Sequence, residues 1–210
     1  MKIEIPSGSF SAYLFDCDGT IADSMPLHYI AWRKALAPWN CEYAEEQHYA
    51  WGGRPTPEII SGLNSRDGLS MPVEATAQLK EEYYYELLHQ LEPVPEVLAI
   101  IRAEYGRIPF AVVTGSNRES VLKSLDAIGL SGVFPVIVSS EEYERPKPAP
   151  DAYLVAAARL GVAPADCLVF EDTEIGIQAA TAAGMQSVRV PSPLERRGQT
   201  QATADRSGFS

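Results

Sequence analysis

The sequence predicts an α/β fold, a doubly wound parallel sheet, with an all-helical segment inserted after the first strand. From residue 93 onward, short apolar runs alternate with helix-like segments of about 10 to 15 residues, which is the pattern of βαβ units. Between residues 24 and 92, apolar positions recur at helical spacing and no convincing strand occurs. We therefore expect a core of residues 1–23 and 93–191, a helical cap of residues 24–92, and a polar tail of residues 192–210.

The individual elements follow from apolar periodicity and from turn residues. The first strand is the apolar run Ala12–Phe15, which ends at Asp16. In the inserted segment we expect helices over 27–36, 45–50 and 73–91. Between the last two we expect a further helix, which Thr56 caps and which ends at a polar loop over 64–70. Beyond it we expect strands over 110–113, 136–138, 168–170 and 187–190, and helices over 97–103, 121–128, 150–160 and 175–183.

Composition limits the partners that this chain can have. A formal net charge of -11 argues against a nucleic acid or an anionic membrane as partner, because either would need a basic surface. Three cysteines without a C-x-x-C pair suit a reducing compartment. The N-terminus lacks the apolar region of a signal peptide, and no apolar run reaches membrane-spanning length. We expect a cytoplasmic protein, a monomer or a weak dimer, that acts on a small molecule.

Two carboxylates follow the first strand. If the extended geometry persists, Asp16 and Asp18 project from the same face of the strand end. Anions this close repel each other unless a cation or a shared proton lies between them. Such a pair suits a divalent metal and attack on a phosphoryl group, in which a carboxylate forms an aspartyl-phosphate. A strand followed by a simple Asp-Gly turn explains the isolated motif equally well.

Other polar residues follow the later strands. Ligands bind at the carboxyl ends of the strands in an open α/β sheet, so these residues would meet the first carboxylates at one edge. Each has a simpler explanation when it is taken alone, as a helix cap or a solvated loop residue, but their joint occurrence favours a site. The residues are Thr114, Ser116, Asn117, Lys147, Glu171 and Asp172.

In this order the motifs resemble the haloacid dehalogenase superfamily, specifically its phosphatases and phosphomutases with a helical cap after the first strand. The resemblance runs from Tyr13 to Val190. It is carried by Asp16–Thr20, Val113–Ser116, Lys147–Pro148 and Phe170–Asp172. Within the family, the sequence is similar to the β-phosphoglucomutase-like sugar phosphatases, including the fructose-1-phosphatase type. The dehalogenases themselves lack the second aspartate, so Asp18 disfavours that activity.

The resemblance implies a Mg²⁺-dependent phosphatase that acts on a small sugar phosphate. Asp16 would be the nucleophile, and Asp18 would protonate the leaving group and then deprotonate the water. Thr114 and Lys147 would neutralise the phosphoryl oxygens. The expected ligands of Mg²⁺, a hard cation that prefers oxygen, are Asp16, Asp18 through its main-chain carbonyl, Glu171 and Asp172.

The resemblance also implies substrate-binding residues. Backbone N–H groups around Ser116 and Asn117 would assist at the phosphoryl group. The segment from Gly52 to Thr56 resembles the substrate-specificity loop of the family, in which Arg54 would hold the sugar or a second anionic group. His28 and Lys80 lie near cap positions that the mutases use, although a packed histidine and an exposed helix lysine explain them as well.

Two other functions compete with the phosphatase. A β-phosphoglucomutase would return the phosphoryl group to a sugar instead of water. A receiver-like signalling module also gathers Asp, Thr and Lys at its strand ends, but the long helical insertion and the D-x-D spacing speak against it. The identity of the sugar is not defined by these motifs.

Overall fold

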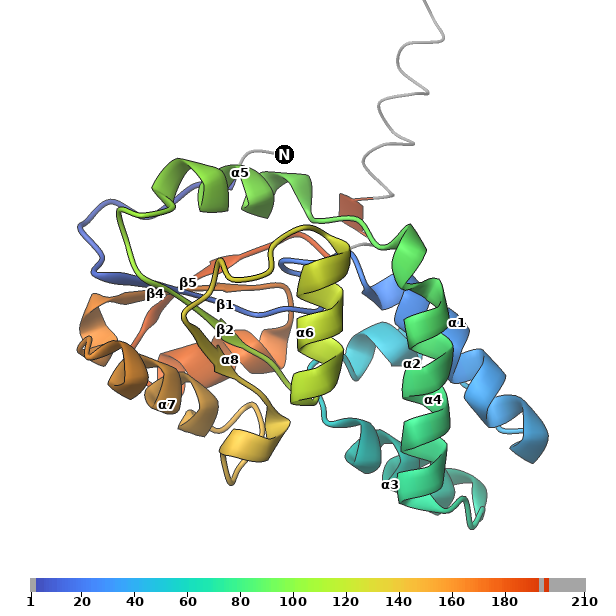
Figure 1. The fold of residues 1–210 in the computed structure, drawn as a ribbon. Helices are drawn as coiled ribbons and strands as arrows, with labels where there is room; N and C mark the ends of the chain where they lie inside the picture. The colour runs from blue at the N-terminus through green and yellow to red at the C-terminus, as the bar shows by residue number, and fades with distance from the viewer. Residues whose placement is uncertain (1–2, 193–194, 197–210) are drawn as a thin grey trace, which may run out of the picture.

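A parallel sheet lies at the centre of the computed structural model, which describes residues 3–192 and 195–196 (Figure 1). Its five strands are ordered β3-β2-β1-β4-β5, and every neighbouring pair is parallel. The strands are β1 (Ala12–Phe15), β2 (Phe110–Val113), β3 (Val136–Val138), β4 (Cys167–Glu171) and β5 (Gln186–Arg189). Because β1 is central and the strand order reverses there, its carboxyl end is the switch point at which α/β proteins bind ligands.

Helices cover both faces of this sheet, as the doubly wound fold predicts (Figure 1). On one face, α5 (Pro95–Glu104) and α6 (Arg118–Ala127) pack on the aromatic side chains of Tyr13, Phe15 and Phe110. On the other, α7 (Asp151–Leu160) and α8 (Glu174–Ala182) pack on Leu14 and its neighbours. Successive β1 side chains thus enter opposite cores, as the two-residue period of a strand requires. All four β1 residues are buried, which explains the continuous apolar run.

Four helices form the inserted segment between β1 and α5. They are α1 (Met25–Leu36), α2 (Glu45–Ala50), α3 (Thr56–Asp67) and α4 (Val73–Leu87), with short 3₁₀ turns over Ala37–Trp39 and Leu88–Gln90. Trp32, Leu36, Ile60 and Leu63 form a separate small core between them. In the part of the chain that the structure describes, no helix has the length and apolar character needed to cross a membrane.

The two ends of the inserted segment lie side by side. Asp23 N donates to Glu92 O at 2.9 Å, and Ala22 and Pro93 form an antiparallel bridge. Val94 N then donates to Ile21 O at 2.9 Å. The helices therefore leave the sheet and return to it at one point, next to the carboxyl end of β1.

Several predicted boundaries differ from the structure. Thr56 is the first residue of α3, and the preceding Pro55 takes the cap position without a side-chain bond. The loop expected over 64–70 is shorter, because α3 continues until Gly68 ends it in a left-handed conformation with φ of 66°. The fourth helix ends at Leu87 and becomes a 3₁₀ turn. The last strand lies one residue earlier, and most of the expected polar tail lies outside the described residues.

Candidate active site

A buried lysine joins the ends of the central strands. Lys147 comes from the loop before α7, and its Nζ lies 2.6 Å from Asp16 Oδ1 and 2.7 Å from Glu171 Oε1. The same ammonium group donates to the main-chain carbonyl of Val113, at the end of β2, at 3.1 Å. Burial alone would lower the pKa of Lys147, but the two carboxylates raise it well above its ordinary value. Lys147 therefore carries its positive charge directly beside Asp16.

Glu171 is fixed by the protein at both carboxylate oxygens. Besides Lys147, Oε1 accepts from the Tyr153 hydroxyl at 3.3 Å. Oε2 accepts from the backbone N and from Oγ1 of Thr173, each at 2.8 Å. A Cβ at Gly176 would lie 1.7 Å from Glu171 Oε1, so only glycine leaves room for this carboxylate under α8. Glu171 thus orients Lys147 as well as adding negative charge to the site.

Three carboxylates converge close to Lys147. Asp16, Glu171 and Asp172 offer oxygens that all lie within 4.8 Å of one another. Burial raises the pKa of Asp172 to about 8, and the charge of Glu171 adds to the shift. Burial also raises the pKa of Asp16, although Lys147 opposes the shift. A divalent cation would compensate this crowded negative charge, and the all-oxygen donor set fits Mg²⁺.

The turn after β1 is shaped to bring Asp172 close. Gly19 has φ of 90°, and a Cβ there would lie 2.3 Å from Asp172 Oδ2. The next residue, Thr20, donates its hydroxyl to Asp172 Oδ1 at 3.0 Å. The D-x-D-G-T motif therefore supplies both the carboxylates after β1 and the positioning of the one after β4.

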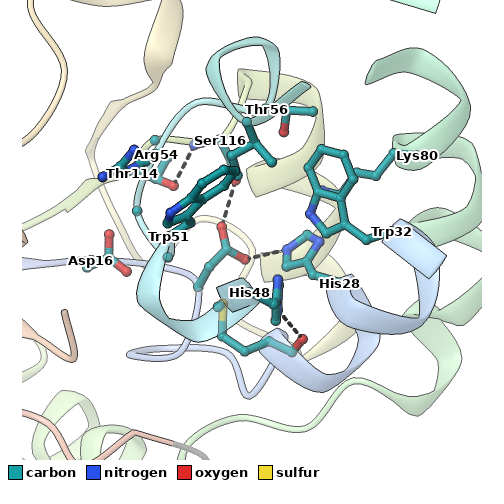
Figure 2. A pocket seen from close by; sticks show the side chains of 16 residues that line it. Asp16, His28, Trp32, His48, Trp51, Arg54, Thr56, Lys80, Thr114 and Ser116 are labelled. Carbon is teal, nitrogen blue, oxygen red and sulfur yellow. Dashed lines mark hydrogen bonds and ion pairs between the residues drawn. The ribbon is translucent and has the colours of Figure 1, made fainter. Parts of the chain in front are cut away.

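The Asp18 side chain points away from the cluster of Asp16, Glu171 and Asp172 and toward the inserted helices. Its Oδ1 lies 3.0 Å from His28 Nε2, and its Oδ2 accepts from Ser116 Oγ at 2.7 Å (Figure 2). Oδ1 also accepts from Ser24 Oγ at 2.6 Å. Burial alone would raise the pKa of Asp18, but the His28 charge and these hydrogen bonds hold it below its ordinary value. The Asp18 carboxylate is therefore ionised and links α1 to the loop after β2.

A small cavity of about 50 Å³ separates the inserted helices from the strand ends (Figure 2). Lining residues come from both parts of the chain: Asp16, Asp18, Thr114 and Ser116 from the strand ends, and His28, Trp32, His48, Trp51, Gly52, Arg54 and Lys80 from the helices and their loops. At roughly 10 to 15 Å³ for each water, this volume holds a few water molecules and no sugar phosphate. We therefore expect the inserted helices to move when a substrate enters.

Two glycine loops lie in contact beside this cavity. A Cβ at Gly115 would lie 2.7 Å from Gly53 O, so the loop after β2 approaches the loop between α2 and α3 at backbone distance. Arg54, next to Gly53, is exposed and its guanidinium lies over the Trp51 ring at 5.4 Å. The predicted loop residues thus reach the site from the inserted segment.

Most predicted site residues come together. The Asn117 side chain does not line the cavity, because its Oδ1 accepts from Ser120 N at 2.8 Å and caps α6; the role expected of the backbone N–H groups near it stays a prediction. Sequence reasoning missed several residues that hold or line the site: Thr20, Ser24, Trp32, His48, Trp51, Tyr153 and Thr173. Of these, Trp51 carried a usable signal, since it directly precedes the glycine loop.

Fold and site together define a hydrolase of the doubly wound α/β class, with an acidic site at the end of its central strand and helices closing over it. The model of the family "Haloacid dehalogenase-like hydrolase" matches residues 13–190. The chain belongs to this family. The predicted superfamily and fold class are confirmed.

Curated relatives and solved structures agree with this membership. The chain is 37% identical over 182 residues to fructose-1-phosphate phosphatase YqaB of Escherichia coli, an alignment that covers 86% of this chain and 96% of that protein. It is 30% identical over 181 residues to a phosphorylated carbohydrates phosphatase of Thermotoga maritima, covering 84% and 83%. The crystal structure of CbbY from Rhodobacter sphaeroides, in complex with phosphate, superposes with a TM-score of 0.80 at 25% identity, covering 89% and 88%. The predicted enzyme class, a phosphoric monoester hydrolase of this family, is confirmed.

Proposed function

We propose that the protein is a Mg²⁺-dependent phosphatase that hydrolyses a small sugar phosphate through an aspartyl-phosphate on Asp16. The observation that carries the proposal is the pairing of the buried Asp16 with Lys147 at 2.6 Å, at the carboxyl end of the central strand. A carboxylate held there is aligned by its neighbours and shielded from bulk water, as a nucleophile toward phosphorus must be.

The reaction takes two displacements. A carboxylate oxygen of Asp16 attacks phosphorus, the bond from phosphorus to the sugar oxygen breaks, and Asp18 gives that oxygen a proton. Asp18 then takes a proton from water, whose oxygen attacks the phosphorus of the aspartyl-phosphate, so that inorganic phosphate leaves and Asp16 is restored. An anionic phosphoryl group raises the pKa of a nearby carboxyl. Substrate binding thus favours uptake of a proton from water by Asp18, which is ionised in the ligand-free site.

The other polar residues stabilise the phosphoryl group. Lys147 and Thr114 lie at the same strand ends and would bind its equatorial oxygens, with the backbone N–H groups near Ser116. Asp16, Asp172 and the main-chain carbonyl of Asp18 would hold Mg²⁺, which supplies further charge neutralisation at the phosphoryl oxygens. Glu171 stands beside them, and its four protein contacts favour an orienting role over direct ligation.

Residues 24–92 would act as a cap that selects the substrate. Its loop and helices contribute Gly52, Arg54, His28 and Lys80 to the cavity wall. The names of the Escherichia coli and Thermotoga maritima relatives support a phosphorylated sugar as substrate. A β-phosphoglucomutase reaction is not favoured, since these relatives are named phosphatases. Residence in the cytoplasm stays a prediction.

A phosphate-release screen tests this function. The purified protein is incubated with a panel of sugar phosphates, with Mg²⁺ or with EDTA, and inorganic phosphate is measured. We expect release that requires Mg²⁺ and falls by about 10³-fold or more in Asp16→Asn, which keeps the shape and loses the attacking anion. Near-native release by Asp16→Asn would refute the nucleophile. Isomerisation of β-glucose 1-phosphate without phosphate release would establish the mutase instead.

A further inference from the structure

We propose that Glu81 makes this enzyme select sugar monophosphates over sugar bisphosphates. It neutralises Lys80 at the end of the cavity remote from Asp16 and ties it to the sheet-packed helix α6. The inference rests on the proposed function and adds to it a residue outside the phosphoryl-transfer site.

Lys80 is a buried cation in the cavity wall. It lies on α4, is 3% exposed, and stands beside Trp32 on the side of the cavity opposite Asp16 (Figure 2). Its Nζ lies 5.6 Å from the centroid of the Trp32 ring and donates to Glu81 Oε1 at 2.9 Å. Among the described residues, Glu81 is the one hydrogen-bond acceptor of this ammonium group. Because an ammonium group has three N–H donors, Lys80 keeps donors for a bound ligand.

Glu81 is held as an anion by both of its neighbours. Its second oxygen, Oε2, accepts from Ser120 Oγ at 3.1 Å. Ser120 lies in the first turn of α6, where the helix dipole favours negative charge. Burial alone would raise the pKa of Glu81, but the charges of Lys80 and His28 and the two hydrogen bonds lower it. Glu81 is 9% exposed, so water screens the pair only weakly.

A second contact keeps α4 and α6 in register. One turn after Glu81, the Tyr84 hydroxyl lies 2.8 Å from Ser124 Oγ. Ser124 Oγ in turn donates to Ser120 O at 2.9 Å. In the arrangement described, these two contacts thus join α4 of the inserted segment to α6, which follows the phosphoryl-binding loop, and they set the distance of Lys80 from that loop.

The net charge of Lys80 and Glu81 determines which substrate groups can bind at the end of the cavity remote from Asp16. Lys80 and Glu81 sum to zero, so a sugar hydroxyl can accept a hydrogen bond from Lys80 at no electrostatic cost. A second phosphate, with a charge of about -1.5 to -2, would approach the Glu81 carboxylate with no net positive charge from this pair to compensate. Among the described residues, the other lysine or arginine that lines the cavity is Arg54. Its side chain is exposed and lies over Trp51, so it does not neutralise this end of the cavity.

The test compares kcat/KM for fructose 1-phosphate and fructose 1,6-bisphosphate, with p-nitrophenyl phosphate reporting the phosphoryl chemistry. The native enzyme should prefer the monophosphate. Glu81→Gln leaves Lys80 unopposed and should shift this preference about tenfold or more toward the bisphosphate. Lys80→Gln leaves the anion alone and should shift it the other way. The double variant Lys80→Gln/Glu81→Gln restores neutrality and should return the native ratio, while Glu82→Gln, on the exposed side of α4, is the matched control.

Each outcome decides the proposal. A structural role for Glu81 would lower kcat/KM for both sugars equally, and the double variant would not restore the ratio; either result overturns the inference. If Glu81→Gln does not fold, the opposite shift in Lys80→Gln decides the question. If the native enzyme hydrolyses the monophosphate and the variants do not change the ratio of the two kcat/KM values, only the role of Glu81 is refuted. A native enzyme that releases phosphate from p-nitrophenyl phosphate and from no sugar phosphate refutes the proposed function, and this inference with it.

Discussion

Gly115→Ala should oppose closure of the cap without weakening the fold. In the described structure the new Cβ would lie 2.7 Å from Gly53 O and 3.3 Å from Gly53 C, where ordinary contacts begin at 3.4 Å. The two loops must therefore separate by about 0.7 Å. Neither contact atom is a flexible side chain, so the backbone has to move. Overpacking of this kind costs about 1–3 kcal/mol. The backbone of Gly115 is not in the left-handed region, so alanine adds no strain of its own.

We expect the cost to fall on the arrangement in which the two loops touch, and to be relieved when the inserted helices move away. We expect kcat/KM for the preferred sugar phosphate to fall about 5- to 150-fold, the equivalent of that energy, as measured by phosphate release. The midpoint of thermal unfolding should stay within about 2 °C of the native value. Native kcat/KM would show that closure does not bring these loops together during the reaction. A large loss of thermal stability would show that the contact is structural.

Three further predictions concern the metal, the specificity loop and pH. Asp172→Ala should raise the Mg²⁺ concentration needed for half-maximal activity sharply, since one oxygen ligand is lost; an unchanged titration would make Asp172 a helix-start residue only. Arg54→Ala should lower kcat/KM more for the preferred sugar phosphate than for p-nitrophenyl phosphate, and an equal loss would make the loop structural. Burial lowers the pKa of His48 from 6.5 to about 4. Between these two pH values the unfolded chain therefore binds a proton at His48 and the folded protein does not. The free energy of unfolding should therefore fall by about 3 kcal/mol between pH 6.5 and 4. Denaturant titration should show a flatter profile for His48→Gln and the native slope for the exposed His89→Gln; equal slopes in all three would contradict the assignment.

The sheet could be predicted because its central strands β1, β2 and β4 are buried on both faces. Such strands appear as continuous apolar runs, and the predicted 12–15, 110–113 and 136–138 match β1, β2 and β3. The acidic site followed from the same reasoning, since polar residues directly after parallel strands meet at one edge. The two prolines around Lys147 favoured a fixed position for this loop lysine, but its burial between two carboxylates has no local sign in the sequence.

What the sequence could not show depends on contacts between distant segments. Thr20 and Asp172 are 152 residues apart, and nothing near either of them indicates their hydrogen bond. Ser24 looks like the cap of α1, yet its hydroxyl turns to Asp18 instead. The end of α3 was misplaced because Asn64 is a common loop residue, whereas here its amide bonds the backbone of Met71 in both directions.

The meeting of Asp23 with Glu92 at the base of the inserted helices has a consequence for how such proteins diversify. The hydrogen bond between these two residues, with the bridge between Ala22 and Pro93, brings the chain back to its point of departure. A segment of any length whose two ends lie this close together can be inserted after β1, because it is joined to the sheet only through two short connections. Recombination can thus exchange the inserted helices while the sheet and the residues at its strand ends are inherited unchanged.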